Sequence, residues 1–201
     1  FVNSLSAADG GSIYLYSAQN TIASNTFNNA TNTVGSGSAI YIDGDNQVIK
    51  ANSISNGSGF LSGAIYFNNG ANALISGNTF YNILGATWLV GGRGGGLRFT
   101  GSVSSATISG NTFTSTRATF GGAIDLNGTG HVVTGNTFTS TLAAPYSGGA
   151  TGAGAICVCG GSNHLVTLNT FTSSSVDPST NMTGGALNIT GTSNVTVTYN
   201  L

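Results

Sequence analysis

The chain is 201 residues long, only 4% of its residues are charged, and its formal net charge is −1. About a quarter of the residues are charged in an average globular protein, so neither nucleic acid nor an anionic membrane surface is expected as a partner. Hydrophobic residues make up 39% of the chain and the mean hydropathy is +0.18, which favours a packed core over disorder. No apolar run of about 18 residues is present, so a helical membrane span is not expected. The length suits one domain over residues 1–201.

Two short phrases alternate along the chain. The first consists of small residues followed by an aliphatic one, and it ends at Ile13, Ile40, Ile65, Leu97, Ile124, Ile156 and Leu187. The second contains an asparagine, as in "SGNTF" at 109–113, and that asparagine is Asn25, Asn52, Asn78, Asn111, Asn136, Asn169 and Asn200. Each asparagine follows its aliphatic residue by 12 to 14 positions, whereas successive units are 25 to 33 residues apart. One half of the repeat is therefore fixed in length and the other half varies.

Each unit contains three predicted strands in the same order. The first alternates inward and outward residues, and it is expected at 13–15, 40–42, 65–67, 97–99, 124–126, 156–158 and 187–189. The second has an Ile or Val three residues before the asparagine, and the third has a Phe or Ile two residues after it. Stacking such units about 4.8 Å apart gives an all-β parallel β-helix of about seven coils without helical caps. The asparagines from Asn25 to Asn169 are expected to form a hydrogen-bonded ladder along it.

The phrases "ISGNTF" and "GGAI" resemble the right-handed parallel β-helix repeats of the pectate-lyase-like superfamily. They also resemble bacterial surface adhesins, including polymorphic outer-membrane proteins. The resemblance covers nearly the whole chain and implies a single-stranded right-handed β-helix. Function stays open, since this fold hosts lyases, hydrolases, epimerases, adhesins and fibres. The low charge, the scarcity of Lys and triplets such as the one at Asn29 favour an extracellular or cell-surface location.

An enzyme on this fold needs clustered carboxylates. The five acids are Asp9, Asp43, Asp45, Asp125 and Asp177. Asp43 and Asp45 share the turn "DGDN", for which a structural role is preferred over weak cation binding. No pair of acids is placed across a groove together with a basic residue. The sequence therefore predicts no catalytic residues, no metal site and no cofactor.

Several outward residues fall in columns. Arg98 and Asp125 are expected to form a surface ion pair worth roughly 0 to 1 kcal/mol. Cys157 and Cys159 lie two residues apart, a spacing at the edge of disulfide reach, so free thiols, a bridge that needs a bulge and a bridge between subunits all stay open. The column of His131 and His164 provides too few ligands for a metal, and the histidines are expected to be structural residues at strand entry. "GGRGGG" lacks the strand-to-helix context of a phosphate loop.

Surface binding has three candidate groups. An outward column of Tyr14, Tyr41 and Tyr66 is expected to pack or to contact another subunit, with sugar binding as the alternative. Trp88 lies in a long corner loop, where it is expected to be either a contact residue or an anchor of the loop. A hydroxyl lattice similar to the faces of β-solenoid ice-binding proteins is expected from Thr112, Thr114, Thr116, Thr137, Thr139, Thr141, Thr170, Thr172 and Ser174, although Thr also simply favours strands.

The two ends of the chain suggest an assembly. Joined head to tail, Asn200, Leu201, Phe1 and Val2 reproduce the Asn-Thr-Phe register, with Leu201 in the Thr position. These four residues are the predicted interface of a homopolymer that builds an extracellular filament. The alternatives are a passenger segment of an adhesin or autotransporter that contacts glycans or a host surface, an ice-binding protein and a carbohydrate-active enzyme.

Overall fold

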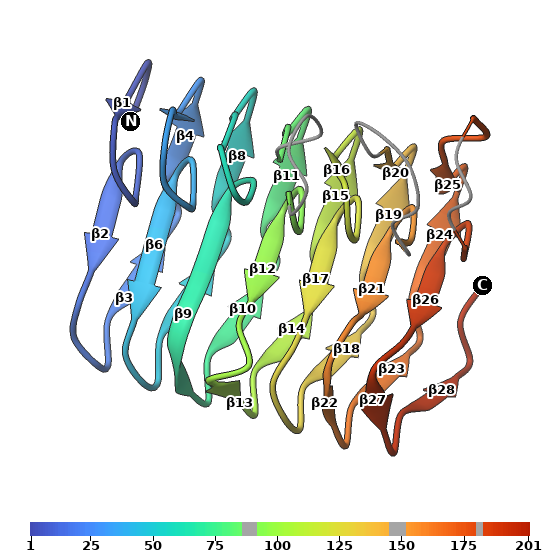
Figure 1. Ribbon diagram of the computed structural model, residues 1–201. Coiled ribbons are helices and arrows are strands. Elements are labelled where there is room, and N and C mark those ends of the chain that lie inside the picture. Colours follow the sequence, from blue (N-terminus) through green and yellow to red (C-terminus); the bar gives the residue numbers. More distant parts are fainter. Residues whose placement is uncertain (86–91, 145–151, 180–182) are drawn as a thin grey trace.

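The chain folds into a parallel β-helix. The computed structural model describes residues 1–85, 92–144, 152–179 and 183–201, and those residues contain strands and no helix. Successive coils lie side by side from the N-terminal end to the C-terminal end (Figure 1). Within this described part, no helix is long and apolar enough to cross a membrane. The predicted all-β fold of about seven coils is confirmed.

Three parallel sheets run along the axis. The first sheet contains β2 (Ile13–Leu15), β6 (Ile40–Asp43), β9 (Ile65–Ala71), β12 (Leu97–Phe99), β17 (Ile124–Leu126), β21 (Ile156–Val158) and β26 (Leu187–Ile189), and β13 (Val103–Ser104) pairs with β9. The second contains β3 (Thr21–Ala23), β7 (Val48–Lys50), β10 (Leu74–Ser76), β14 (Thr107–Ser109), β18 (Val132–Thr134), β23 (Leu165–Thr167) and β28 (Thr196–Thr198). The third contains β4 (Thr26–Asn28), β8 (Ser53–Ser55), β11 (Thr79–Tyr81), β15 (Thr112–Thr114), β19 (Thr137–Thr139) and β24 (Thr170–Thr172).

The coils also contain short strands that the sequence does not predict. They are β1 (Leu5–Ser6) paired with β5 (Thr31–Asn32), the row β16 (Arg117–Ala118), β20 (Leu142–Ala143) and β25 (Ser175–Val176), and β22 (Gly161–Ser162) paired with β27 (Thr192–Ser193). Three strands per coil is thus a minimum. Two residues are too few to show alternation, so periodicity overlooks these strands even though Ala118, Ala143 and Val176 align.

Identical residues stack in the core because equivalent strands pair in register. Phe113 lies between Phe80 and Phe138, with ring centroids 4.6 and 5.0 Å away and nearly parallel planes. Phe67 and Phe99 stack in the same way at 4.7 Å. Such spacing matches the distance between strands, and each aromatic pair contributes about 0.5–1.5 kcal/mol beyond its buried area.

The corner between the second and third sheets is the same in every coil. It consists of two residues, of which the first has a left-handed backbone and the second is the ladder asparagine. The left-handed residues are Ser24, Ala51, Gly77, Gly110, Gly135, Leu168 and Tyr199, with φ between 52° and 63°. Glycine adopts this conformation without strain, which explains the glycine in "SGNTF".

Candidate functional site

The asparagine ladder runs through the whole molecule with one direction. The backbone N–H and the side-chain amide of Asn111 both donate to Oδ1 of Asn136 in the next coil, at 2.9 and 3.0 Å. Asn111 also donates to the carbonyl of Ile75 in the preceding coil at 2.9 Å. The same arrangement joins Asn25, Asn52, Asn78, Asn111, Asn136, Asn169 and Asn200. Each buried amide is thereby satisfied by its neighbours, so the ladder fixes the register between coils.

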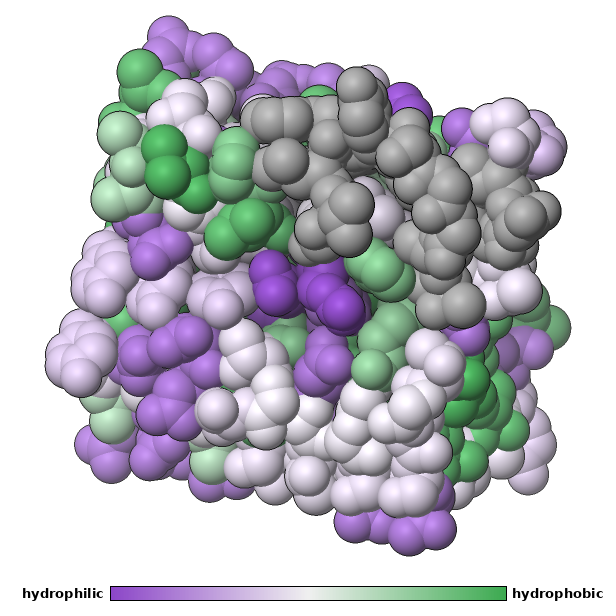
Figure 2. Space-filling view, viewed as in Figure 1, coloured by the Kyte–Doolittle hydropathy of each residue, from purple (hydrophilic) through white to green (hydrophobic). Residues whose placement is uncertain are grey.

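Both end coils present open strand edges. At one end Phe1 stacks on Phe27 with centroids 4.8 Å apart, and Val2 bridges to Asn28. At the other end the Leu201 N–H donates to the carbonyl of Asn169, just as the Thr170 N–H donates to the carbonyl of Asn136 one coil earlier. Exposed apolar residues gather at these two ends, namely Phe1, Val2, Leu5, Tyr14, Ile189, Val197, Tyr199 and Leu201. Figure 2 shows hydrophobic surface over the first coils and along the edge of the last ones.

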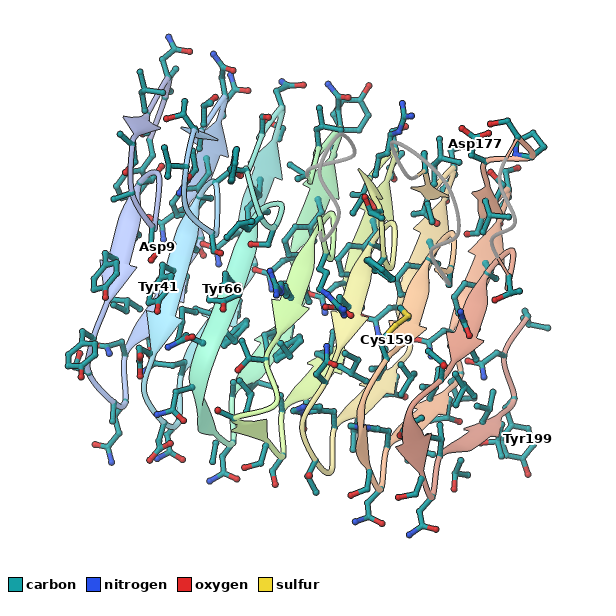
Figure 3. All side chains as sticks on the ribbon, viewed as in Figure 1. Asp9, Tyr41, Tyr66, Cys159, Asp177 and Tyr199 are labelled. Carbon is teal, nitrogen blue, oxygen red and sulfur yellow. A yellow bond between two sulfur atoms is a disulfide. The ribbon has the colours of Figure 1, made fainter. Side chains whose placement is uncertain are left out.

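The tyrosine column stacks on itself. The rings of Tyr14 and Tyr41 are parallel with centroids 4.7 Å apart, and Tyr41 and Tyr66 follow at 5.3 Å. Tyr41 and Tyr66 stand next to each other on the outer side of the first sheet (Figure 3). Neighbouring tyrosine rings cover each other's faces, so a sugar would contact mainly the ring edges. Tyr41 is in addition only 8% exposed. The arrangement fits the packing interpretation of this column.

The threonine lattice has fewer outward columns than expected, and one of its columns extends over more coils. Thr112, Thr137 and Thr170 align across neighbouring strands, as do Thr114, Thr139 and Thr172. Thr116 and Thr141 are fully buried, so placing them on the lattice is wrong. The residues before them, Ser115 and Ser140, have φ of 55° and 53°, and this turn reverses the alternation of side chains. Sequence reasoning also missed that the first column continues as Thr26, Ser53 and Thr79.

The main charged cluster lies on the outer side of the first sheet. Nη1 of Arg93 is 3.4 Å from Oδ1 of Asp125, and Nε of Arg98 is 3.9 Å from Oδ2. Asn127 donates to the same carboxylate at 3.2 Å. Arg93 lies over the ring of Phe120. A strongly hydrophilic patch is visible over β12 and β17 at the centre of this face (Figure 2).

Asp125 is 0% exposed, so the expectation of a surface ion pair is wrong. Arg93 was not predicted because it lies in a glycine-rich segment outside the repeat, and it covers Asp125 from there. Burial raises the pKa of Asp125 to about 6, and the two guanidinium groups limit that rise. Burial also lowers the pKa of Arg98. Removing one partner of such a buried pair typically costs about 3–5 kcal/mol.

Cys157 and Cys159 form a disulfide beside this cluster. Their Cα atoms are 5.2 Å apart, closer than in an extended strand, because β21 ends at Val158 and the chain turns at Cys159. Cys157 is fully buried, which corrects its placement on the surface, whereas Cys159 is partly exposed. Figure 3 shows the bridge at the end of β21.

Asp125 and Cys157 face each other across paired strands. A carboxylate oxygen of Asp125 and both sulfur atoms lie within 4.8 Å of one another. In this structure the carboxylate is paired with Arg93 and Arg98 and the two sulfur atoms are bonded to each other, so the three atoms are in contact but do not form a free ligand set. An adjoining depression of about 230 Å³ is lined by Arg93, Arg98, Phe99, Thr100, Gly101 and Asn127.

The two histidines belong to the core. The Nδ1 atom of His131 accepts from the Ala106 N–H at 3.1 Å, and its Nε2 lies 2.7 Å from the carbonyl of Asn127. The ring is therefore neutral with its proton on Nε2. His164 repeats this arrangement one coil later and stacks on His131. Burial lowers the pKa of His131 to about 4 and lowers that of His164 as well.

The remaining acids hold turns. Asp43 accepts from the Asn68 amide at 2.9 Å, and Asp45 accepts from the backbone of Ala71 at 2.8 Å, so each ties its turn to the next coil. Asp9 accepts from the N–H of Ser36, and Asp177 accepts from Ser179, which lowers the pKa of Asp177.

Trp88, expected from the sequence to be either a contact residue or a loop anchor, lies outside the described residues.

Comparison with known proteins agrees with the fold. The family model described as right handed beta helix region matches residues 2–171. No curated protein and no solved structure matches the chain.

Proposed function

Because the chain belongs to the right-handed β-helix family, a fold used by both enzymes and structural proteins, we propose that it is structural. In this proposal, copies stack end to end into an extracellular filament. The supporting observation is the asparagine ladder, which has the same geometry and the same direction in successive coils, so that one coil can be placed on another without a change in hydrogen bonding. From Asn52 to Asn169, each ladder asparagine accepts at Oδ1 from one neighbouring coil and donates through its backbone N–H to the other, so every coil has acceptors on one side and donors on the opposite side.

The direction of the ladder defines the joint. Each asparagine donates to the asparagine of the next coil toward the C-terminal end. Asn200 of one copy would therefore donate to Asn25 of the next, as Asn169 donates to Asn200 within the chain at 2.9 and 3.0 Å. Strands β26 and β28 would then continue into β2 and β3 of the second copy. Such a joint is heterologous and does not close, so it builds a rod.

Apolar contacts support the same joint. Val197, which occupies the core column after Val166, is 42% exposed in the last coil. In the first coil the equivalent position is Ile22, one coil before Ile49 in the same column. Stacking would bury Val197 against Ile22 as Val133 is buried against Val166, and burying such a side chain contributes about 1.5–3 kcal/mol.

The test is negative-stain microscopy of the purified chain together with light scattering. Rods with an axial repeat of about 34 Å, seven strand spacings, are expected. Val197→Glu places a charge in the joint and should abolish the rods. Thr196→Glu, on the outward side of the same strand, is the matched control and should leave them intact. Monomers at every concentration, or equal effects of the two variants, would refute the proposal.

Ice binding is a second candidate, supported by the hydroxyl column of the third sheet. This column comprises six residues, Thr26, Ser53, Thr79, Thr112, Thr137 and Thr170. Paired strands repeat about every 4.8 Å. Thermal hysteresis that is lost in Thr137→Lys, within this column, but kept in Thr107→Lys, on the outward side of the second sheet, would support ice binding. Its absence from the unmodified chain would remove the candidate.

A further inference from the structure

The Cys157–Cys159 disulfide is in an unusual place for a structural bridge. It joins residues two positions apart and lies within one coil. Disulfides stabilise mainly by closing long loops in the unfolded chain, and this one closes a very short loop. The coils themselves are held by strand pairing and by the asparagine ladder. The bridge therefore adds little to the fold.

The surroundings of the bridge suit sulfur chemistry. Cys159 is partly exposed and Cys157 is buried, so an incoming thiolate reaches the sulfur of Cys159 first. The sulfur of Cys157 is then the leaving group. A carboxylate oxygen of Asp125, its partner across the strands, lies within 4.8 Å of both sulfur atoms.

We propose that Cys157–Cys159 is an exchangeable disulfide that oxidises thiols, with Asp125 supplying a proton to the departing sulfur of Cys157. An external thiolate attacks Sγ of Cys159, the S–S bond breaks, and a mixed disulfide forms while the electron pair goes to Cys157. The Asp125 carboxylic acid protonates that thiolate. A second thiolate attacks the mixed disulfide and releases the oxidised thiol, so that two thiols lose two electrons and the protein becomes a dithiol.

The charges around Asp125 fit this role. Arg93 and Arg98 face the carboxylate from outside β17, and Asn127 donates to it from the end of its own strand. The two arginines oppose the effect of burial on Asp125, so its pKa stays below the usual thiol pKa of about 8.5 and proton transfer from the carboxyl group to the Cys157 thiolate is favourable. Burial raises the pKa of Asp125 to about 6, so a protonated carboxyl group is populated in mildly acidic solution.

The first test compares the two sulfur atoms. The folded chain is incubated with reduced glutathione, quenched by alkylation and analysed by mass spectrometry, and reduction without loss of fold is expected. Cys157→Ser leaves the accessible thiol, and Cys159→Ser, its matched control, leaves the buried one. We expect oxidised glutathione to modify Cys157→Ser at least tenfold faster than Cys159→Ser. Equal rates, or a bridge that glutathione reduces only in denaturant, would overturn the proposal.

The second test addresses Asp125 through the pH profile. The rate constant for reduction, expressed per thiolate, is expected to fall about tenfold or more between pH 5 and pH 8, as general acid catalysis requires. Asp125→Asn should show a flat profile, and circular dichroism checks that this variant is folded. An unchanged profile in folded Asp125→Asn would remove Asp125 from the reaction. If the variant does not fold, the pH profile of the unmodified chain decides, since a flat profile there also contradicts proton donation.

Discussion

His131 makes the stability of the β-helix sensitive to acid. The ring is buried and neutral, and its pKa is lowered from 6.5 to about 4. A group with a lowered folded pKa stabilises fully above its unfolded pKa and loses that contribution as the pH falls. Between pH 6.5 and pH 4, the free energy of unfolding should therefore decrease by about 3 kcal/mol through His131, at 1.36 kcal/mol per pKa unit.

Asp125 acts in the opposite direction in nearly the same range. Its pKa is raised from 3.8 to about 6, so its contribution is complete below pH 3.8 and is lost as the pH rises through 6. Acidification from pH 6 thus recovers about 3 kcal/mol. The lowered pKa of His164 adds to the loss from His131. A variant that removes only the titration of His131 separates these contributions.

His131→Gln is that variant, because Gln47 occupies the equivalent position in an earlier coil. Gln47 accepts from the Asn20 N–H at 3.2 Å and donates to the carbonyl of Ser17. Glutamine should therefore keep the hydrogen bonds of His131 and lose about 1 kcal/mol of ring stacking at every pH. Between pH 7.5 and pH 4, the free energy of unfolding of the variant should therefore rise by about 3 kcal/mol relative to that of the unmodified chain, because the variant lacks the loss caused by protonation of His131. Urea unfolding followed by circular dichroism measures this gain, and parallel stability curves would refute the reasoning.

Three further predictions concern other buried or strained positions. Asn111→Ala should reduce the free energy of urea unfolding by about 3 kcal/mol, because buried partners lose their hydrogen bonds on both sides; a loss below 1 kcal/mol would contradict a structural ladder. Leu168→Asn should raise the free energy of unfolding, measured by thermal unfolding, by roughly 0.5–1 kcal/mol, since Leu168 is exposed with φ of 58°. Gly135→Ala should lower it by a similar amount, and a change of the same sign in both variants would count against backbone strain. Arg93→Gln should raise the pKa of Asp125 further, because Arg93 is the stronger of the two cations that oppose the effect of burial, and a carboxyl ¹³C titration that shows no upward shift would argue against this assignment.

The fold could be predicted from the sequence because every coil repeats the same physical requirements. The inward residues of equivalent strands must stack, so Phe113 recurs as Phe138, and the corner needs the same asparagine each time. The repetition predicts that the asparagines form a ladder, whereas the direction of its hydrogen bonds is known only from the structure. These features recur at equivalent positions in every coil, which is the information that an internal repeat contains.

The charged cluster could be predicted only in part for the opposite reason. Arg98 and Asp125 share a column, so their pairing follows from the repeat. Burial of Asp125 depends on Arg93, which has no equivalent in the other coils. Similarly, Thr116 is buried because Ser115 has a left-handed backbone, and alternation assumes an extended chain. Sequence periodicity describes the columns and does not describe what covers them.

The corners of the coil differ in length, and this difference shows where the chain can accept inserted residues and where it cannot. Two residues connect the second sheet to the third in every coil, whereas 9 to 16 residues connect the third sheet to the next strand of the first. An insertion at the two-residue corner would interrupt the hydrogen-bonded asparagines. Insertions at the longer corner leave the stacked columns in place, and connecting segments of this kind tolerate change. That corner is therefore the natural place to graft foreign peptides, and a row of different loops could be displayed there at regular intervals along one rigid rod.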